Sequence, residues 1–297
     1  MVLYNGDNTH KGKLLFRSAI MDSGSIVPAN PVDCPRGHNI YKTVVKKAGC
    51  SGASDTLACL HNVDYETFLK ATISIPGAFD YQSVALAYLP QPDGIAVTPS
   101  PDFLTLNGQF ASVPFIIGDQ EDEGTLFSLV QSNIITTDQL VEYLSTVFFP
   151  KVTADQAQQL VATYLGDLSA GSLHNTSLLN EIYPQYKRVA SILGNHVFIL
   201  TCRVFLNYFV SANPSIPSWS YLASCNYGTP VLGTFYPSDI LTTYDITSTF
   251  ASASIQQYYI NFFNTMVPND STQVCRVDYS GVKGMSCYNF WRRVMGC

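Results

Sequence analysis

Three short apolar runs, each closed by small or polar turn residues, divide the chain into repeating units. They cover residues 16–22, 113–118 and 219–224. Short apolar runs that end at turn residues are typical of buried strands. Longer segments between the runs place apolar residues at helical spacing. Because strands alternate with helices, we predict an α/β fold in which helices flank a mostly parallel sheet.

The helical segments can be located individually. Thr153-Ala154-Asp155-Gln156 has the pattern of a capping box, and apolar residues follow it at helical spacing. Residues 183–210 predict a longer helical region that we expect to break near Gly194. Residues 248–266 predict a further helix with one apolar face, made of Ile255, Tyr258, Tyr259, Phe262 and Phe263.

Composition supports a chain with a large core. Apolar residues make up 46% of the 297 residues and charged residues 13%, and the net charge is −6. A nucleic-acid partner would normally need a basic face, and the densest basic pair is Arg292-Arg293, so no such partner is expected. The most apolar stretch, residues 197–210, is shorter than the ~20 residues of a membrane span and contains polar side chains, so we interpret it as a buried helix.

The cysteines and the N-glycosylation triplets bear on whether the chain belongs in an oxidising, secretory compartment. Cys50 and Cys59 bracket a short polar loop that suits a local disulfide, although two free cysteines on neighbouring turns fit the spacing equally well. No cysteine pair has zinc-site spacing, and we predict neither a metal nor a cofactor. Asn175 and Asn269 each begin an N-glycosylation triplet, a pattern that also arises by chance. Residues 1–7 do not have the form of a signal peptide.

An acidic run follows the second predicted strand. Residues 118–125 contain Glu121, Asp122 and Glu123. A carboxylate at the end of a strand can orient a catalytic histidine, but a solvated acidic turn is the simpler interpretation from chemistry alone. The five histidines are not placed as a base after a strand, with His174 in a polar loop and His196 opening an apolar helix. The chain contains no Gly-x-Ser-x-Gly elbow, and residues 22–25, Asp-Ser-Gly-Ser, lack its leading glycine.

Several segments, taken in order, resemble type-B carboxylesterases and lipases, above all the yeast lipases of the Candida rugosa type. The resemblance spans roughly Leu3 to Pro268. It is carried by Phe16-Arg17-Ser18-Ala19-Ile20-Met21-Asp22-Ser23-Gly24, the cysteine loop from Ala48 to Leu60, Tyr88-Leu89-Pro90-Gln91-Pro92-Asp93-Gly94, residues 113–125, residues 183–188, and Gly228-Thr229-Pro230-Val231-Leu232-Gly233-Thr234-Phe235.

The resemblance implies the C-terminal part of an α/β-hydrolase fold, secretion, and an ester or lipid substrate such as a long-chain acylglycerol or sterol ester. It implies that Glu123 is the acid of a Ser-Glu-His triad and that Cys50 and Cys59 form a disulfide. Tyr236 stands where the resemblance places the histidine. The serine elbow and the oxyanion loop are expected upstream of Met1.

We therefore expect residues 1–268 to be the C-terminal part of one α/β-hydrolase domain. Residues 269–297 form an atypical tail with three cysteines and little apolar periodicity, and we expect it to be disordered or the product of a shifted reading frame. The expected function is that of a truncated, inactive lipase homologue, since tyrosine cannot shuttle protons near neutral pH as histidine does. The alternatives are a piece of a longer active secreted lipase and a non-catalytic binding module.

Overall fold

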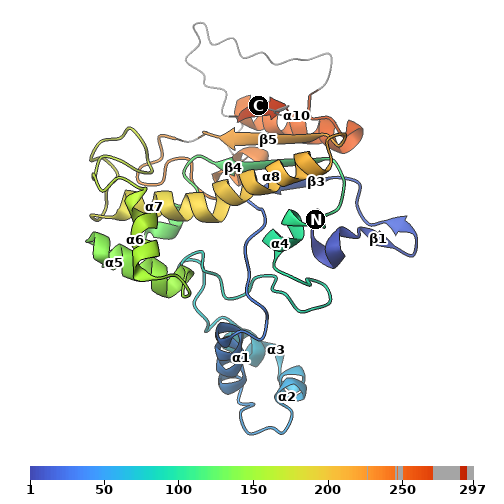
Figure 1. The fold of residues 1–297 in the computed structure, drawn as a ribbon, viewed down its shortest axis with the longest axis vertical. Coiled ribbons are helices and arrows are strands. Elements are labelled where there is room, and N and C mark those ends of the chain that lie inside the picture. The colour runs from blue at the N-terminus through green and yellow to red at the C-terminus, as the bar shows by residue number, and fades with distance from the viewer. Residues whose placement is uncertain (226, 245, 247–249, 270–287, 293–297) are drawn as a thin grey trace, which may run out of the picture.

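The centre of the molecule is a mixed sheet with strand order β3–β4–β5–β6 (Figure 1). The computed structural model describes residues 1–225, 227–244, 246, 250–269 and 288–292. Strands β3 (Ala19–Asp22), β4 (Phe115–Gln120) and β5 (Ser218–Ala223) run parallel, and β6 (Tyr288–Arg292) runs antiparallel to β5. The three predicted strands are therefore present, each shifted by a few residues at its ends.

Helices cover both faces of the sheet, as predicted for an α/β fold. Because side chains alternate along a strand, the fully buried β4 sends neighbouring residues to opposite faces. Phe115 and Ile117 pack against Phe205 and Phe209 of helix α8 (Leu200–Ala212). Ile116 faces the other layer, where helix α10 (Phe250–Thr265) supplies Ile255, Tyr259 and Phe262. Figure 1 shows these two helices on either side of the strands.

A second group of helices packs beyond one end of the strands. It contains α5 (Thr137–Tyr143), α6 (Ala154–Ala162) and α7 (Tyr186–Gly194), which share one apolar cluster. The predicted capping box at Thr153 is confirmed, and Thr136 forms a second one before α5. The remaining elements are short: η1 (Leu3–Gly6), β1 (Thr9–His10), β2 (Lys13–Leu14), α4 (Pro101–Leu106), η2 (Leu126–Ser128), η3 (Leu144–Phe148) and α9 (Ser238–Thr243).

The break predicted near Gly194 is wrong. A π-helical turn, η4 (Asn195–Ile199), joins α7 to α8, so the helix continues from Tyr186 to Ala212. A wider turn accommodates the extra residue without ending the helix. This joined helix is long and apolar enough to cross a membrane by length and composition, but 56% of its most apolar window is buried in the fold, and core helices of water-soluble proteins meet the same criteria.

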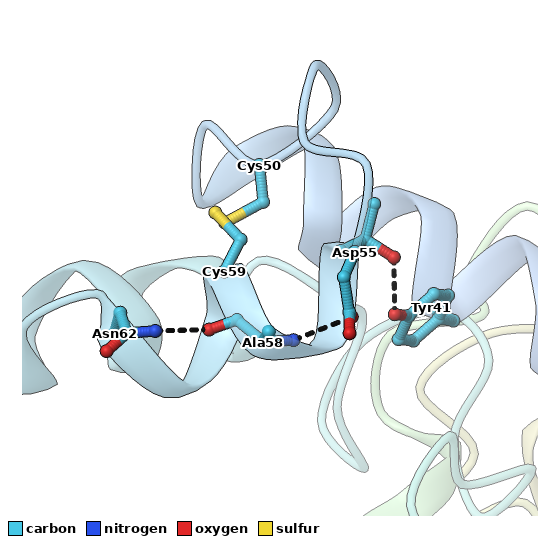
Figure 2. The surroundings of a disulfide bond; sticks show 7 residues. Tyr41, Cys50, Asp55, Ala58, Cys59 and Asn62 are labelled. Atoms are coloured by element: carbon cyan, nitrogen blue, oxygen red, sulfur yellow. Dashed lines mark hydrogen bonds between the residues drawn. A yellow bond between two sulfur atoms is a disulfide. The ribbon is translucent and has the colours of Figure 1, made fainter.

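Helices α1 (Pro35–Lys47), α2 (Thr56–Asn62) and α3 (Tyr65–Thr72) project from the sheet as a separate lobe (Figure 1). The lobe has its own small core. The predicted disulfide is confirmed, because Cys50 and Cys59 are bonded with their Cα atoms 5.8 Å apart. Figure 2 shows the bond beside the start of α2, where the Asp55 carboxylate accepts a hydrogen bond from the Ala58 amide at 2.9 Å.

The C-terminal predictions have mixed outcomes. Of the residues predicted to form one apolar face of α10, Ile255, Tyr259 and Phe262 are buried, Tyr258 is half-buried and Phe263 is 57% exposed. Strand β6 comes from within residues 269–297. Cys275, Cys287 and Cys297 lie outside the described residues, so the nature of this tail and its boundary near residue 268 stay predictions.

A glycine contact between the loop after β4 and helix α7 yields a stability prediction. A Cβ atom added at Gly124 would lie 1.9 Å from the backbone oxygen of Ala190 and 2.7 Å from the Gly194 nitrogen. Backbone atoms cannot move aside as a flexible side chain can, so we expect Gly124→Ala to lower the free energy of unfolding by about 3 kcal/mol. Urea unfolding followed by tryptophan fluorescence measures this. The control is Gly52→Ala, where an added Cβ meets nothing within 4 Å; equal stability of the two variants would contradict the prediction.

Candidate active site

Glu123 lies in the loop after β4 and is almost fully buried, with 1% of its surface exposed. Its Oε1 atom accepts hydrogen bonds from the Ser23 hydroxyl at 2.6 Å and from the Gln120 amide at 2.7 Å. Its Oε2 atom is also buried and has no hydrogen-bond partner among the described residues. One carboxylate oxygen is thus held in place while the other is left without a donor.

The surroundings of Glu123 favour its protonated form. Burial raises the pKa of this carboxyl group to about 8, although the hydrogen bonds from Ser23 and Gln120 act to lower it. The charges of Asp119 and Asp239 raise the pKa further because they repel a third negative charge. A positively charged donor at Oε2 would reverse this balance, and an imidazolium is such a donor.

Tyr236 lies in the loop that follows β5, and it packs as an aromatic side chain. Its ring centroid is 5.2 Å from that of Phe127 and 5.8 Å from that of Phe198. In the described part of the chain the structure contains no hydrogen bond between its hydroxyl group and Glu123. Phe127 is four residues beyond Glu123, so the acid loop and the Tyr236 loop are neighbours. The triad positions assigned to Glu123 and Tyr236 remain predictions.

Asp122 connects these two loops directly. The Asp122 amide donates to the Thr234 carbonyl at 2.9 Å, and Oδ2 accepts from the Thr234 amide at 3.0 Å. Oδ1 accepts from the Ser172 hydroxyl at 2.6 Å. The Thr125 hydroxyl adds a bond to the Leu232 carbonyl at 2.7 Å. Sequence reasoning grouped Asp122 with solvent-facing acids, because its partners lie 50 and 112 residues away.

A cavity of about 480 Å³ opens beside these two loops. Ser23, Tyr236, Asp239 and Tyr259 are among the residues that line it. Burial, helped by the charge of Asp22, raises the pKa of Asp239 to about 6. The cavity therefore presents a hydroxyl group hydrogen-bonded to Glu123 beside acidic and aromatic side chains. Sequence reasoning did not pair Ser23 with Glu123; the only available signal was that each follows a strand of the same parallel sheet.

The histidines lie elsewhere. His174 is exposed, and its charge lowers the pKa of Asp122 and Glu121 while burial raises both. His196 has its ring centroid 6.1 Å from that of Phe149 and 6.3 Å from that of Tyr164, and burial lowers its pKa. Neither donates a hydrogen bond to Glu123 within the described residues.

Other predicted sites are at the surface. Asn175 and Asn269 are both exposed, so each side chain is accessible, and glycosylation at either stays a prediction. The described residues contain no group of three or more His, Cys, Asp or Glu side chains that could hold a metal ion.

The sequence profile of the carboxylesterase family matches residues 8–276. This chain belongs to the carboxylesterase family. It is 56% identical to "Secreted lipase 1" of Botryotinia fuckeliana over 273 residues, which cover 92% of this chain and 48% of that protein. It is 54% identical to "Secreted triacylglycerol lipase LIP1" of Gibberella zeae, covering 91% of this chain and 46% of that protein.

The predicted likeness to the Candida rugosa lipases is also confirmed. "Lipase 4" of Diutina rugosa is 42% identical over 90% of this chain and 48% of its own length. The fold is that of EstA from Aspergillus niger, with a TM-score of 0.70 at 20% identity over 90% of this chain and 52% of that one. The α/β-hydrolase fold is therefore established. The chain spans about half the length of the curated relatives it matches.

The raised pKa of Glu123 predicts how stability depends on pH. The folded-state value, about 8, exceeds the ordinary value of 4.5, so the folded chain holds this proton more tightly than the unfolded chain. The resulting stability is fully present below about pH 4.5 and is lost as pH rises towards 8. We expect Glu123→Gln to become more stable relative to the unsubstituted protein by about 1 kcal/mol per pH unit between pH 6 and 8.

Urea unfolding at several pH values measures this difference. Subtracting the two curves removes the contribution of other titrating groups, such as His196, whose pKa is shifted in the opposite direction. Glu142→Gln at an exposed position is the control and should track the unsubstituted protein. A Glu123→Gln curve parallel to the unsubstituted one across pH 6–8 would show that Glu123 has no raised pKa.

The contacts of Asp122 predict that its removal loosens the acid corner, by which we mean the place where the loop after β4, with Asp122 and Glu123, meets the loop with Thr234 and Tyr236. Asp122→Ala leaves the Ser172 hydroxyl and the Thr234 amide buried without their acceptor. We expect a loss of about 2–4 kcal/mol in unfolding free energy, and faster hydrogen exchange at the Thr234 amide. Asp33→Ala, at an exposed turn, should change neither quantity. Unchanged exchange at Thr234 in Asp122→Ala would refute the connecting role.

Proposed function

We propose that this chain is the acid-bearing part of a secreted lipase of the triacylglycerol or sterol ester type, and that it is inactive as it stands. Hydrolysis would follow the acyl-enzyme route, in which a serine attacks the ester, a histidine moves the proton and Glu123 orients the histidine. Of these groups, the printed sequence supplies Glu123 and places Tyr236 at the position of the base.

One observation carries the proposal. The buried Oε2 atom of Glu123 has no partner, while Oε1 is held by Ser23 and Gln120. Carboxylate oxygens are rarely buried without a donor, and such an atom indicates a missing group. A histidine Nδ1–H would satisfy it, whereas Tyr236 packs its ring against Phe127 and Phe198. These contacts support a site in which Glu123 would orient a base at its free oxygen, a place that Tyr236 does not occupy.

The substrate class and secretion rest on the relatives. Two relatives above 50% identity are named as secreted lipases, one of them a triacylglycerol lipase. The Cys50–Cys59 disulfide is consistent with an oxidising compartment. The same disulfide and the exposed sequons at Asn175 and Asn269 fit a secreted glycoprotein.

Two alternatives predict different behaviour. A piece of a longer active lipase would become active once joined to the rest of the enzyme without any substitution. A binding module would never hydrolyse esters in any combination. We favour the inactive lipase because residue 236 is a tyrosine, and a phenol does not take up and return a proton near neutral pH as an imidazole does.

Ester hydrolysis distinguishes these possibilities. The purified chain and Tyr236→His should both fail to hydrolyse p-nitrophenyl butyrate and palmitate above buffer. Joining the remaining half of the Botryotinia fuckeliana relative should give activity only together with Tyr236→His, with a difference of at least about 10³-fold, as expected when a general base is restored.

Each other outcome has a defined meaning. Activity of the joined protein without the substitution would favour the longer active lipase, and no activity in any form would favour the binding module. Turnover by the unmodified chain that a serine-directed phosphonate blocks would refute inactivity, and Ser23 would be the first serine to test.

A further inference from the structure

A separate cavity of about 650 Å³ lies beside the N-glycosylation triplet that begins at Asn175. Its lining residues all fall between Thr163, at the end of α6, and Asn195, just beyond α7, and Asn175 is one of them. Glu123 and Tyr236 do not line it, so it is separate from the acid corner. A group attached to the Asn175 side chain would therefore begin at the edge of this cavity.

The Asn175 side chain is available for modification. It is exposed, and among the described residues its amide takes part in no hydrogen bond. Asn180, in contrast, is used by the fold, because its Oδ1 atom accepts from the Val231 amide at 2.8 Å. The backbone at Asn175 is left-handed, with φ at 60°, a conformation in which asparagine is several-fold enriched. The nitrogen to which a sugar would be attached is thus unoccupied by any contact of the described fold.

The rest of the triplet is fixed in place. The Lys187 ammonium donates to the Thr176 hydroxyl and to the Ser177 carbonyl, each at 3.0 Å. The Thr176 hydroxyl in turn donates to the Leu173 carbonyl at 2.7 Å. Because the hydroxyl that the triplet requires is used inside the fold, a sugar would be attached before this loop folds. It would then be present when the cavity forms.

The lining of the cavity suits a neutral sugar. Hydroxyl and amide side chains are prominent in it, and such groups both donate and accept hydrogen bonds. Tyr164 adds a half-buried aromatic ring, whose hydroxyl accepts from the Asn195 amide at 3.2 Å, so the ring is held in one orientation. An aromatic face packs well against the C–H groups of a sugar, and the hydroxyl groups of the sugar reach the polar lining.

An anion fits the cavity less well. Among the described residues that line it, Arg188 is the only permanent cation. Its guanidinium donates to the Val161 carbonyl at 2.7 Å and to the Thr137 hydroxyl at 3.1 Å, and its Nε atom is buried. The Arg188 charge is therefore used within the fold instead of being offered to a ligand.

The size of the cavity sets how much sugar it holds. A cavity of about 150 Å³ holds benzene, so one of about 650 Å³ has room for roughly 25 non-hydrogen atoms. N-acetylglucosamine, the sugar with which N-linked glycans begin, has about half that number. The cavity therefore accommodates the first sugar and part of the second.

We propose that Asn175 carries an N-linked glycan whose first N-acetylglucosamine lies in this cavity, against Tyr164 and Asn195. The proposal rests on the proposed secretion, because the sugar donor, an oligosaccharide on a polyprenyl diphosphate, is used in the secretory compartment. In the transfer, the Asn175 amide nitrogen bonds to the anomeric carbon and loses one proton. The bond from that carbon to the diphosphate oxygen breaks, and the lipid diphosphate leaves with the electron pair.

Resistance to a glycosidase gives a direct readout. The chain is secreted from yeast behind an added signal peptide, and peptide mass spectrometry measures the sugar on Asn175. Peptide N-glycosidase F cuts between the asparagine and the first sugar. Gln109→Thr supplies a control, because it creates a triplet at Asn107, which is exposed and does not line the cavity. Native protein should release the Asn175 glycan at least about tenfold more slowly than the Asn107 glycan, and denatured protein should release both equally fast.

Two tryptophan variants test the location. Ala170→Trp fills the cavity, so it should leave Asn175 glycosylated but raise the native release rate to that of the Asn107 glycan. Ala162→Trp, at an exposed position that does not line the cavity, should keep the slow release.

The opposing outcomes are equally defined. An unmodified Asn175, or native release as fast as from Asn107, would overturn the proposal. Slow release that persists in Ala170→Trp would also overturn it, because the protection would then come from elsewhere. So would fast release once the chain is joined to the other half of the Botryotinia fuckeliana relative. No arm measures ester hydrolysis and the signal peptide is added, so failure here would leave the proposed lipase function standing, and missing hydrolysis would leave the glycan proposal standing.

Discussion

The carboxylate of Asp122 holds the candidate site together. It accepts hydrogen bonds from Ser172 and from the Thr234 backbone, and so fixes three loops to one another. The position of Glu123 depends on this contact, since the two residues are adjacent in one short loop. The position of Tyr236 depends on it as well, through Thr234. A side chain that performs no chemistry thus determines where the reacting groups of this family would lie.

The acid corner has an unusual electrostatic balance. The charges that act on Glu123, those of Asp119 and Asp239, are both negative. The Lys187 ammonium does not offset them: it donates to Ser169, Thr176 and Ser177, and the carboxylates that act on it are Glu181 and Asp167. Such a cluster would be stabilised by a cation at the free oxygen of Glu123, and a histidine base becomes one during turnover. In this structure Tyr236 packs against Phe127 and Phe198 instead, and burial with the neighbouring carboxylates favours the protonated form of Glu123.

The sequence predicted those features that depend on local patterns. The apolar run before Glu123 identified β4, and Thr153 with Gln156 identified the start of α6, because strand burial and helix capping each use adjacent residues. The partners of Glu123 and Asp122 were not predictable in this way, since Ser23 is 100 residues from Glu123. The π-helical turn after Gly194 was also missed, because glycine suggested a break where packing keeps the helix continuous.

The contacts of Asp22 have a consequence for the order of folding. Its Oδ1 atom accepts hydrogen bonds from Tyr221 at 2.8 Å and from Tyr259 at 2.6 Å, partners that are 199 and 237 residues away. During synthesis, β3 therefore leaves the ribosome long before the groups that hold its end exist. Pairings of such long range form slowly, and an unpaired strand is open to misassociation in the meantime. Strand β3 can pair with β4 once residue 120 has been made, but the last hydrogen bond at its end waits for α10, so this corner of the fold should be completed late.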